Sequence, residues 1–175
     1  MRKRLWLFVA ALLAVAVTAS VAVAAVNVKR YPVATFGDPD AASVTLRGGN
    51  FSGLGNVPAI ATLTVTATVS YDCLNPQGHL SPGQNPVPAQ PGAAEQDLGN
   101  ADHNGRGTIN DLTATATAPD PPPSAKEVGC GGNGSTQWTV VNPVVTVTGA
   151  NLTITQDGII VFCRNYTEDG IGTAC

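Results

Sequence analysis

The chain has 175 residues, 43% of them hydrophobic and 12% charged, a length that suits one domain with a buried core better than two. Three of its nine Lys and Arg residues lie at its very start, so the remainder carries six basic residues against twelve acidic ones, a net charge of −6. A nucleic-acid-binding domain is expected to be basic, so the composition argues against that class of partner.

Residues 1–24 have the pattern of a secretory signal peptide. Arg2, Lys3 and Arg4 form a basic start, and the stretch that follows is uncharged. Ala22-Val23-Ala24 is an A-x-A site, so we expect cleavage after Ala24, a secreted or extracellular product and no stable membrane insertion afterwards. An uncharged stretch of this length can also span a bilayer, so N-terminal anchoring on the outer face of the membrane is the alternative.

Residues 25–40 show no sustained periodicity, which predicts a flexible lead-in before a domain spanning residues 41–175. Ala42–Arg47 is a short candidate strand. The clearest strand is Thr62–Cys73, where apolar residues alternate strictly with Thr, Ser and Asp. This period of two predicts one face toward a core and one hydroxyl-rich face toward water.

A long loop is expected over residues 75–108, because five prolines between Asn75 and Gly92 forbid a regular ladder there. Alternation returns at Asp111–Thr117, with Leu112, Ala114 and Ala116 on one face, and ends at a proline-rich spacer. Trp138–Thr148 predicts one or two further strands, broken at Asn142-Pro143.

Asp157-Gly158 is a strong signal for a two-residue hairpin turn between Asn151–Gln156 and Ile159–Arg164. Such a turn pairs Ile154 with Val161 and Leu152 with Cys163. The expected apolar face therefore consists of Leu152, Ile154, Ile159, Val161 and Cys163.

These short strands and turn signals predict an all-β fold. We expect a two-layer antiparallel β-sandwich of the immunoglobulin-like class with about seven strands, and a jelly roll or barrel is the second choice. No stretch beyond the signal segment shows the 3.6-residue period of a helix.

Four cysteines lie beyond the signal segment: Cys73, Cys130, Cys163 and Cys175. An even number in an oxidising compartment predicts two disulfides, and three pairings are open. We favour Cys73–Cys130 with Cys163–Cys175, the second clipping the end of the chain onto the last strand. Cys73–Cys163, joining two strands across the sandwich, is the main rival.

One segment resembles a calcium-binding loop. Asn100, Asp102, Asn104 and Asp111 occupy positions 1, 3, 5 and 12 of an EF-hand pattern, with Gly105 at position 6. Position 12 holds Asp instead of the usual bidentate Glu, and no flanking helix is apparent. An ordinary Asx turn at Asn104-Gly105 explains the same residues, so no cofactor is expected beyond this weak calcium hypothesis.

Signatures of catalysis are absent from the sequence. His79 and His103 lie in polar loops without accompanying ligands, and no nucleophile, zinc-protease or phosphate-loop motif occurs. We therefore predict a non-enzyme with no catalytic residues. Trp138, the single tryptophan beyond the signal segment, is expected to fill a core beside a disulfide.

Several short motifs carry a resemblance to a known group of proteins. Val69-Ser-Tyr-Asp-Cys73-Leu-Asn-Pro76, Pro82-Gly-Gln-Asn-Pro86, Gly129-Cys130 and Gln137-Trp138-Thr139 resemble a family of small uncharacterised exported proteins of high-GC Gram-positive bacteria. That resemblance covers about Thr62 to Cys163 and implies an exported, disulfide-containing bacterial protein without indicating a site. In composition alone the chain is similar to the neocarzinostatin-type apoproteins, which are secreted sandwiches that hold a hydrophobic chromophore.

A sequence rich in framework residues and poor in reactive groups predicts a secreted structural or interaction module. Its partner would be an extracellular protein or a cell-surface component, bound by loops at the ends of the sandwich. The alternatives are a small-molecule-binding apoprotein, which needs an apolar cleft, and an extracellular enzyme inhibitor, which needs a rigid exposed loop.

Overall fold

The computed structural model describes residues 26–37, 41–54, 57–100, 105–131, 137–170 and 172–175. Strands make up 63% of the structure, no helix accompanies them in the described residues, and all pairings are antiparallel, so the predicted all-β class is confirmed. The strands are β1 Asn27–Arg30, β2 Val33–Phe36, β3 Ser43–Arg47, β4 Gly49–Ser52, β5 Pro58–Leu74, β6 Leu80–Pro82, β7 Val87–Pro88, β8 Gly92–Asn100, β9 Gly107–Ile109, β10 Leu112–Thr115, β11 Thr139–Gln156, β12 Ile159–Tyr166 and β13 Gly172–Ala174.

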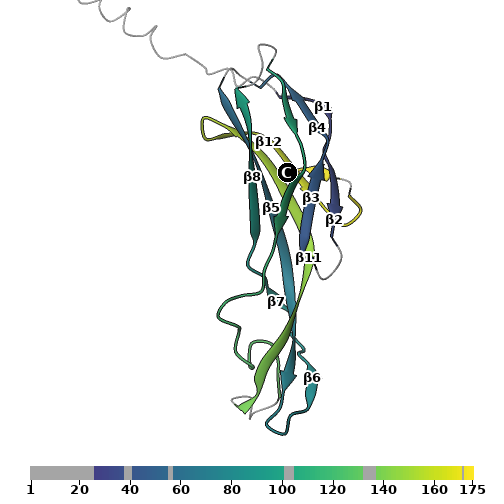
Figure 1. Cartoon of the computed structure of the whole chain (residues 1–175), viewed down its shortest axis with the longest axis vertical. Coiled ribbons are helices and arrows are strands. Elements are labelled where there is room, and N and C mark those ends of the chain that lie inside the picture. Colours follow the sequence, from purple (N-terminus) through teal and green to yellow (C-terminus); the bar gives the residue numbers. More distant parts are fainter. Residues whose placement is uncertain (1–25, 38–40, 55–56, 101–104, 132–136, 171) are drawn as a thin grey trace, which may run out of the picture.

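Two long strands, β5 and β11, form a ribbon that runs from one end of the molecule to the other (Figure 1). β12 and β13 extend this sheet on the β11 side, while β8, β7 and β6 pair in turn along the far edge of β5. At about 3.3 Å per residue the 17 residues of β5 span about 56 Å. The strand predicted at Thr62–Cys73 is therefore confirmed as the central part of a longer one.

Two three-stranded sheets, β1–β4–β9 and β10–β3–β2, cover the upper half of the ribbon in Figure 1. Side chains of all three sheets meet in one core, so this half of the molecule has two layers. The largest fully buried side chains of that core are Tyr166, Phe51, Leu46, Leu63, Ile109, Leu152 and Ile154. The described residues thus form thirteen strands in three sheets, which is more than the seven or so expected.

A second, smaller core lies toward the lower end of the ribbon. Val69, Tyr71 and Cys73 of β5 meet Val128 and Cys130 of the segment after β10. Trp138 is half-buried and packs against this cluster, as expected for a tryptophan beside a disulfide. The hydrophobic side of β5 therefore serves both cores in succession.

Strands appear in two places where the sequence predicted irregular chain. Within the expected lead-in, β1 pairs with β4 and β2 pairs with β3. Within the expected loop 75–108, β6 and β7 each end in a proline, and β8 follows β5 for seven paired positions. Ala, Glu and Gln in β8 have low strand propensity, so its conformation comes from pairing with β5, a tertiary effect.

The predicted hairpin forms, but its register changes beyond the turn. Asp157 and Gly158 both have positive φ, 49° and 75°, as a type I′ turn requires. A β-bulge between Ile154 and Thr155 then pairs Ile154 with Phe162 instead of Val161. Consequently Leu152 pairs with Arg164 and Cys163 pairs with Thr153, which corrects the predicted apolar face.

Candidate functional site

The lower end of the ribbon is fixed by a buried disulfide between Cys73 and Cys130, with Cα atoms 5.5 Å apart. Each cysteine is 1% exposed. This bridge ties the end of β5 to the segment that follows β10, and it confirms the favoured pairing. The bridge therefore holds the two loops at this end, residues 75–91 and 118–131, next to each other.

Backbone hydrogen bonds join those two loops. The N–H of Gly83 donates to the carbonyl of Tyr71, at 2.8 Å. The N–H groups of Gln84 and Asn85 both donate to the carbonyl of Val128, at 2.9 and 3.1 Å. The Asn75 side chain orders the turn before them by accepting the N–H of His79 at 2.8 Å. The proline-rich loop is therefore held at several points along its length.

A short turn at residues 124–130 at this end is closed by hydrogen bonds to a carboxylate. The Glu127 Oε2 accepts both the hydroxyl and the N–H of Ser124, each at 2.7 Å. These two bonds lower the pKa of the Glu127 carboxyl, the side-chain bond most. Charge-assisted bonds of this kind hold the turn that carries Val128 and Cys130 into the small core.

The phenol of Tyr71 lies inside the same core. Its hydroxyl is buried and has no hydrogen-bond partner among the described residues. Burial raises the pKa of this phenol. Since an unsatisfied hydroxyl costs stability, the packing around the disulfide must compensate for it.

The residues of the predicted calcium loop are not assembled into a site in the described part of the chain. Asn100 ends β8, and Asp102 and Asn104 lie outside the described residues. Asp111 is exposed, and its Oδ1 lies 3.2 Å from Nε of Arg47, so this carboxylate forms an ion pair with Arg47. Across the described ranges, no group of three or more His, Cys, Asp or Glu side chains converges as a metal site would require.

Of the two histidines, His79 alone lies in the described part of the chain. His79 is exposed in the turn before β6, and its backbone N–H is used by Asn75. His103 lies outside the described residues.

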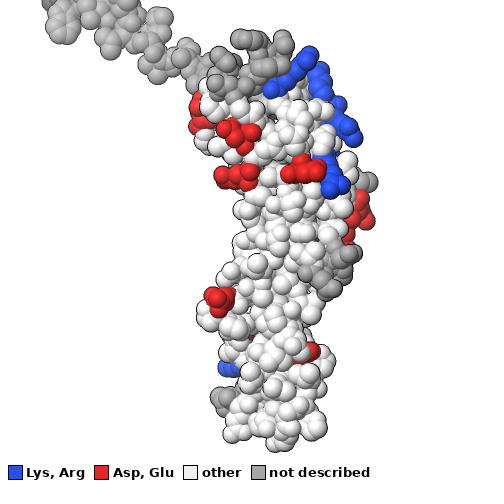
Figure 2. Space-filling model, viewed as in Figure 1, with Lys and Arg blue, Asp and Glu red and all other residues white. Residues whose placement is uncertain are grey.

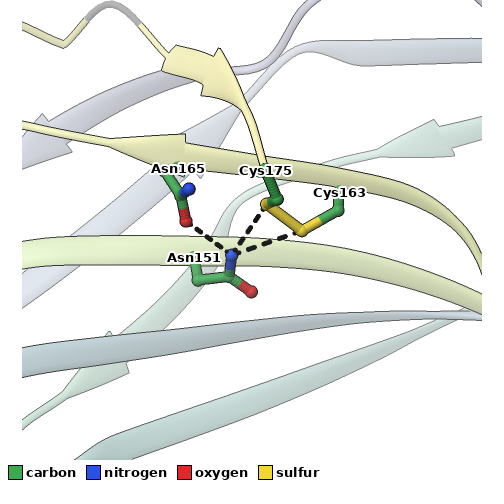
Figure 3. Close-up of a disulfide and its surroundings, with 4 residues drawn as sticks. All are labelled: Asn151, Cys163, Asn165 and Cys175. Carbon is green, nitrogen blue, oxygen red and sulfur yellow. Dashed lines mark hydrogen bonds between the residues drawn. A yellow bond between two sulfur atoms is a disulfide. The ribbon is translucent and has the colours of Figure 1, made fainter.

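The second disulfide, Cys163–Cys175, lies on the opposite, outer face of the large sheet, with Cα atoms 5.6 Å apart. The amide nitrogen of Asn151 lies 3.4 Å from Sγ of Cys163 and 3.2 Å from Sγ of Cys175 (Figure 3). The same nitrogen donates to Oδ1 of Asn165 at 2.8 Å. The contact of Asn151 and Asn165 with this disulfide was not predicted, although Asn is depleted in strands and its presence there was a signal.

A groove of about 330 Å³ opens between the sheets beside β11. Its walls are short side chains and backbone, namely Ala41, Ala42, Thr115, Ala116, Thr117, Ala118, Pro143, Val144 and Val145. It has the size of a small ligand pocket but no converging charged group.

Charge is distributed unevenly over the surface. In Figure 2 the charged side chains on the face shown gather over the half that holds β1, β4 and β8, and the waist below them is largely uncharged. Arg47 and Asp111 form an exposed pair within that charged half.

No family model, curated protein or solved structure matches this chain. In the residues that the structure describes, no helix has the length and apolar character needed to cross a membrane.

Proposed function

We propose that this chain is a secreted, disulfide-stabilised extracellular module without catalytic activity, which binds a protein or a cell-surface component. The observation that carries the proposal is the disulfide-anchored end of the ribbon, where loops 75–91 and 118–131 are bonded to each other. A binding surface made of loops loses less entropy on binding when those loops are already held in place. Disulfides of this kind are typical of oxidising, extracellular compartments.

Export and processing are tested by mapping the secreted protein by mass spectrometry without reduction. We expect an N-terminus at Ala25, with Cys73 linked to Cys130 and Cys163 linked to Cys175. A product that retains residues 1–24 would support the anchored alternative instead. An immunoglobulin-like class for the two-layer half stays a prediction.

Binding through the anchored end is tested with a pair of variants. Gln84→Ala and Asn85→Ala together remove two exposed side chains of the loop, including the bond from Asn85 Nδ2 to the Glu127 carbonyl, but keep the backbone bonds to Val128. Thr113→Ala and Thr45→Ala together remove an exposed hydroxyl pair on β10 and β3 and serve as the control. We expect capture from the surface fraction of the producing organism to fall with the first pair only, and equal capture by both would refute the assignment.

The groove beside β11 supports a second candidate, a small-molecule-binding apoprotein. Its volume of about 330 Å³ lies in the range of ligand sites, and its walls combine Ala, Val and Pro side chains with polar threonine and backbone groups. Ala118→Leu adds bulk at a half-buried position of the wall and should abolish binding of a fluorescent hydrophobic probe. Unchanged probe binding in this variant would remove the candidate. The enzyme-inhibitor alternative rests on the same anchored loop, and a screen against extracellular hydrolases tests it.

A further inference from the structure

One edge of β11 is only partly used. β5 pairs along one side of this strand from Thr139 to Gln156, whereas β12 covers the other side only from Ala150 onward. Among the residues that the structure describes, no strand pairs with this second edge between Thr139 and Gly149. Backbone N–H and C=O groups there are open to a further strand.

The part of this edge that lies between two register shifts is Val144–Val147, because β11 bulges again between Val147 and Gly149. Below it, Pro143 has no backbone N–H to donate, and Asn142 has a positive φ of 52°. These two residues form a bulge between Val141 and Val144 that blocks pairing at the lower end. Four residues at about 3.3 Å each give about 13 Å, the length of a short strand. None of the eighteen residues of β11 is charged, so the charges that commonly protect an edge strand are missing.

The surroundings of the edge favour a strand with small apolar side chains on one face. Val145 and Val147 point to the core side, since they pair with the buried Val69 and Ala67. The groove of about 330 Å³ adjoins the edge on that side, and Val144 and Val145 form part of its wall. The other face presents exposed residues, Val144, Thr146 and Thr148.

We propose that this edge pairs antiparallel with the same edge of a second copy of the chain. A two-fold axis through Thr146 makes Thr146 face its own counterpart. Val145 then pairs with Val147 on the core side, and Val144 lies opposite Thr148, the exposed residue at the upper bulge. Opposite residues must share a face, and this register satisfies that condition at Val145, Thr146 and Val147, which pair regularly with β5.

A second copy satisfies every condition that the edge sets for its occupant. The occupant must carry no charge, because the edge offers none to balance it, and it must place small apolar residues toward the groove. β11 itself meets both conditions, and self-complementary patches of this kind produce two-fold dimers. Of the end loops, Ala118 alone lines the groove beside this edge, so the proposal does not depend on whether those loops bind a partner.

Sedimentation of the exported, oxidised chain tests the proposal over concentrations from about 1 μM to about 1 mM. We expect a monomer–dimer equilibrium in the wild type. Thr146→Lys places two ammonium groups opposite each other, so the dimer dissociation constant should rise about tenfold or more. Ser70→Lys is the matched control, since Ser70 is exposed on the same face one strand inside and pairs with Val144.

Cross-linking gives a second test that does not depend on the lysine variant folding. Opposite residues of an antiparallel pair have Cα atoms about 4.5–5.5 Å apart, within disulfide range. Thr146→Cys should therefore form a disulfide-linked dimer on oxidation, and Ser70→Cys should not. A wild type that stays monomeric throughout, a dimer insensitive to Thr146→Lys, or equal cross-linking by both cysteine variants would each overturn the proposal.

Discussion

Removing the Cys73–Cys130 bridge is expected to cost more stability than removing Cys163–Cys175. The first bridge closes a separation of 57 residues and the second closes 12. The loop-closure entropy lost from the unfolded chain then corresponds to about 4 kcal/mol for the first and about 3 kcal/mol for the second. Cys73 and Cys130 are also buried, whereas Cys175 is exposed, so truncation to Ala removes core contacts only in the first case.

The comparison uses two double variants, Cys73→Ala with Cys130→Ala and Cys163→Ala with Cys175→Ala, each unfolded in urea beside the wild type. Linear extrapolation gives the free energy of unfolding, and an unchanged slope shows that the transition still exposes the same surface. Limited proteolysis should cut the first variant within residues 118–131, because that segment loses its covalent tie. A larger loss from the second variant, or a loss below about 1 kcal/mol from the first, would refute the reasoning.

Three further measurements test other parts of the fold. Leu63→Ala, at a fully buried position in the large core, should cost about 2–5 kcal/mol in urea unfolding, whereas Thr64→Ala on the opposite face of β5 should cost less than about 0.5 kcal/mol. Burial raises the pKa of Tyr166 to about 12, above its unfolded value of 10.0, so the folded state holds this proton more tightly. The resulting contribution to the free energy of unfolding is present below pH 10 and is lost as the pH rises toward 12. Tyr166→Phe should reduce this decline when unfolding is measured as a function of pH. Ser124→Ala removes the hydroxyl bond that lowers the pKa of Glu127, so that pKa should rise in an NMR titration, while an unchanged value would show that the backbone bond alone is responsible.

Local pattern was sufficient for the strands that alternate strictly. Thr62–Cys73 and Asp111–Thr117 reveal their buried faces in the sequence, because period two survives wherever one face meets a core. The turn at Asp157-Gly158 was equally accessible, since a type I′ turn needs positive φ at both positions. Both disulfides match the favoured pairing, although the sequence left rival pairings open.

Features decided by distant parts of the chain were not accessible in this way. The bulge after the hairpin turn brings the Phe162 ring to 5.0 Å from that of Phe51, a contact across more than half of the described chain. β8 becomes a strand only because β5 lies beside it. The acidic residue expected at the end of the calcium loop, Asp111, pairs instead with Arg47 on another strand. In each case a tertiary partner outweighs the local signal.

The bulge also explains why the two disulfides lie on opposite faces of one sheet. Without the extra residue, Cys163 would oppose Leu152 and point into the large core; with it, Cys163 opposes Thr153 on the outer face, where Cys175 and the Asn151 amide meet it. The Cys73–Cys130 disulfide and the loops that it holds therefore lie on the core side of the ribbon. If two copies join at Thr146 with opposite strand directions, these anchored ends lie at opposite ends of the pair. Such a dimer would present its two binding ends in opposite directions, a geometry that suits bridging two separate partners and not avidity for one flat surface.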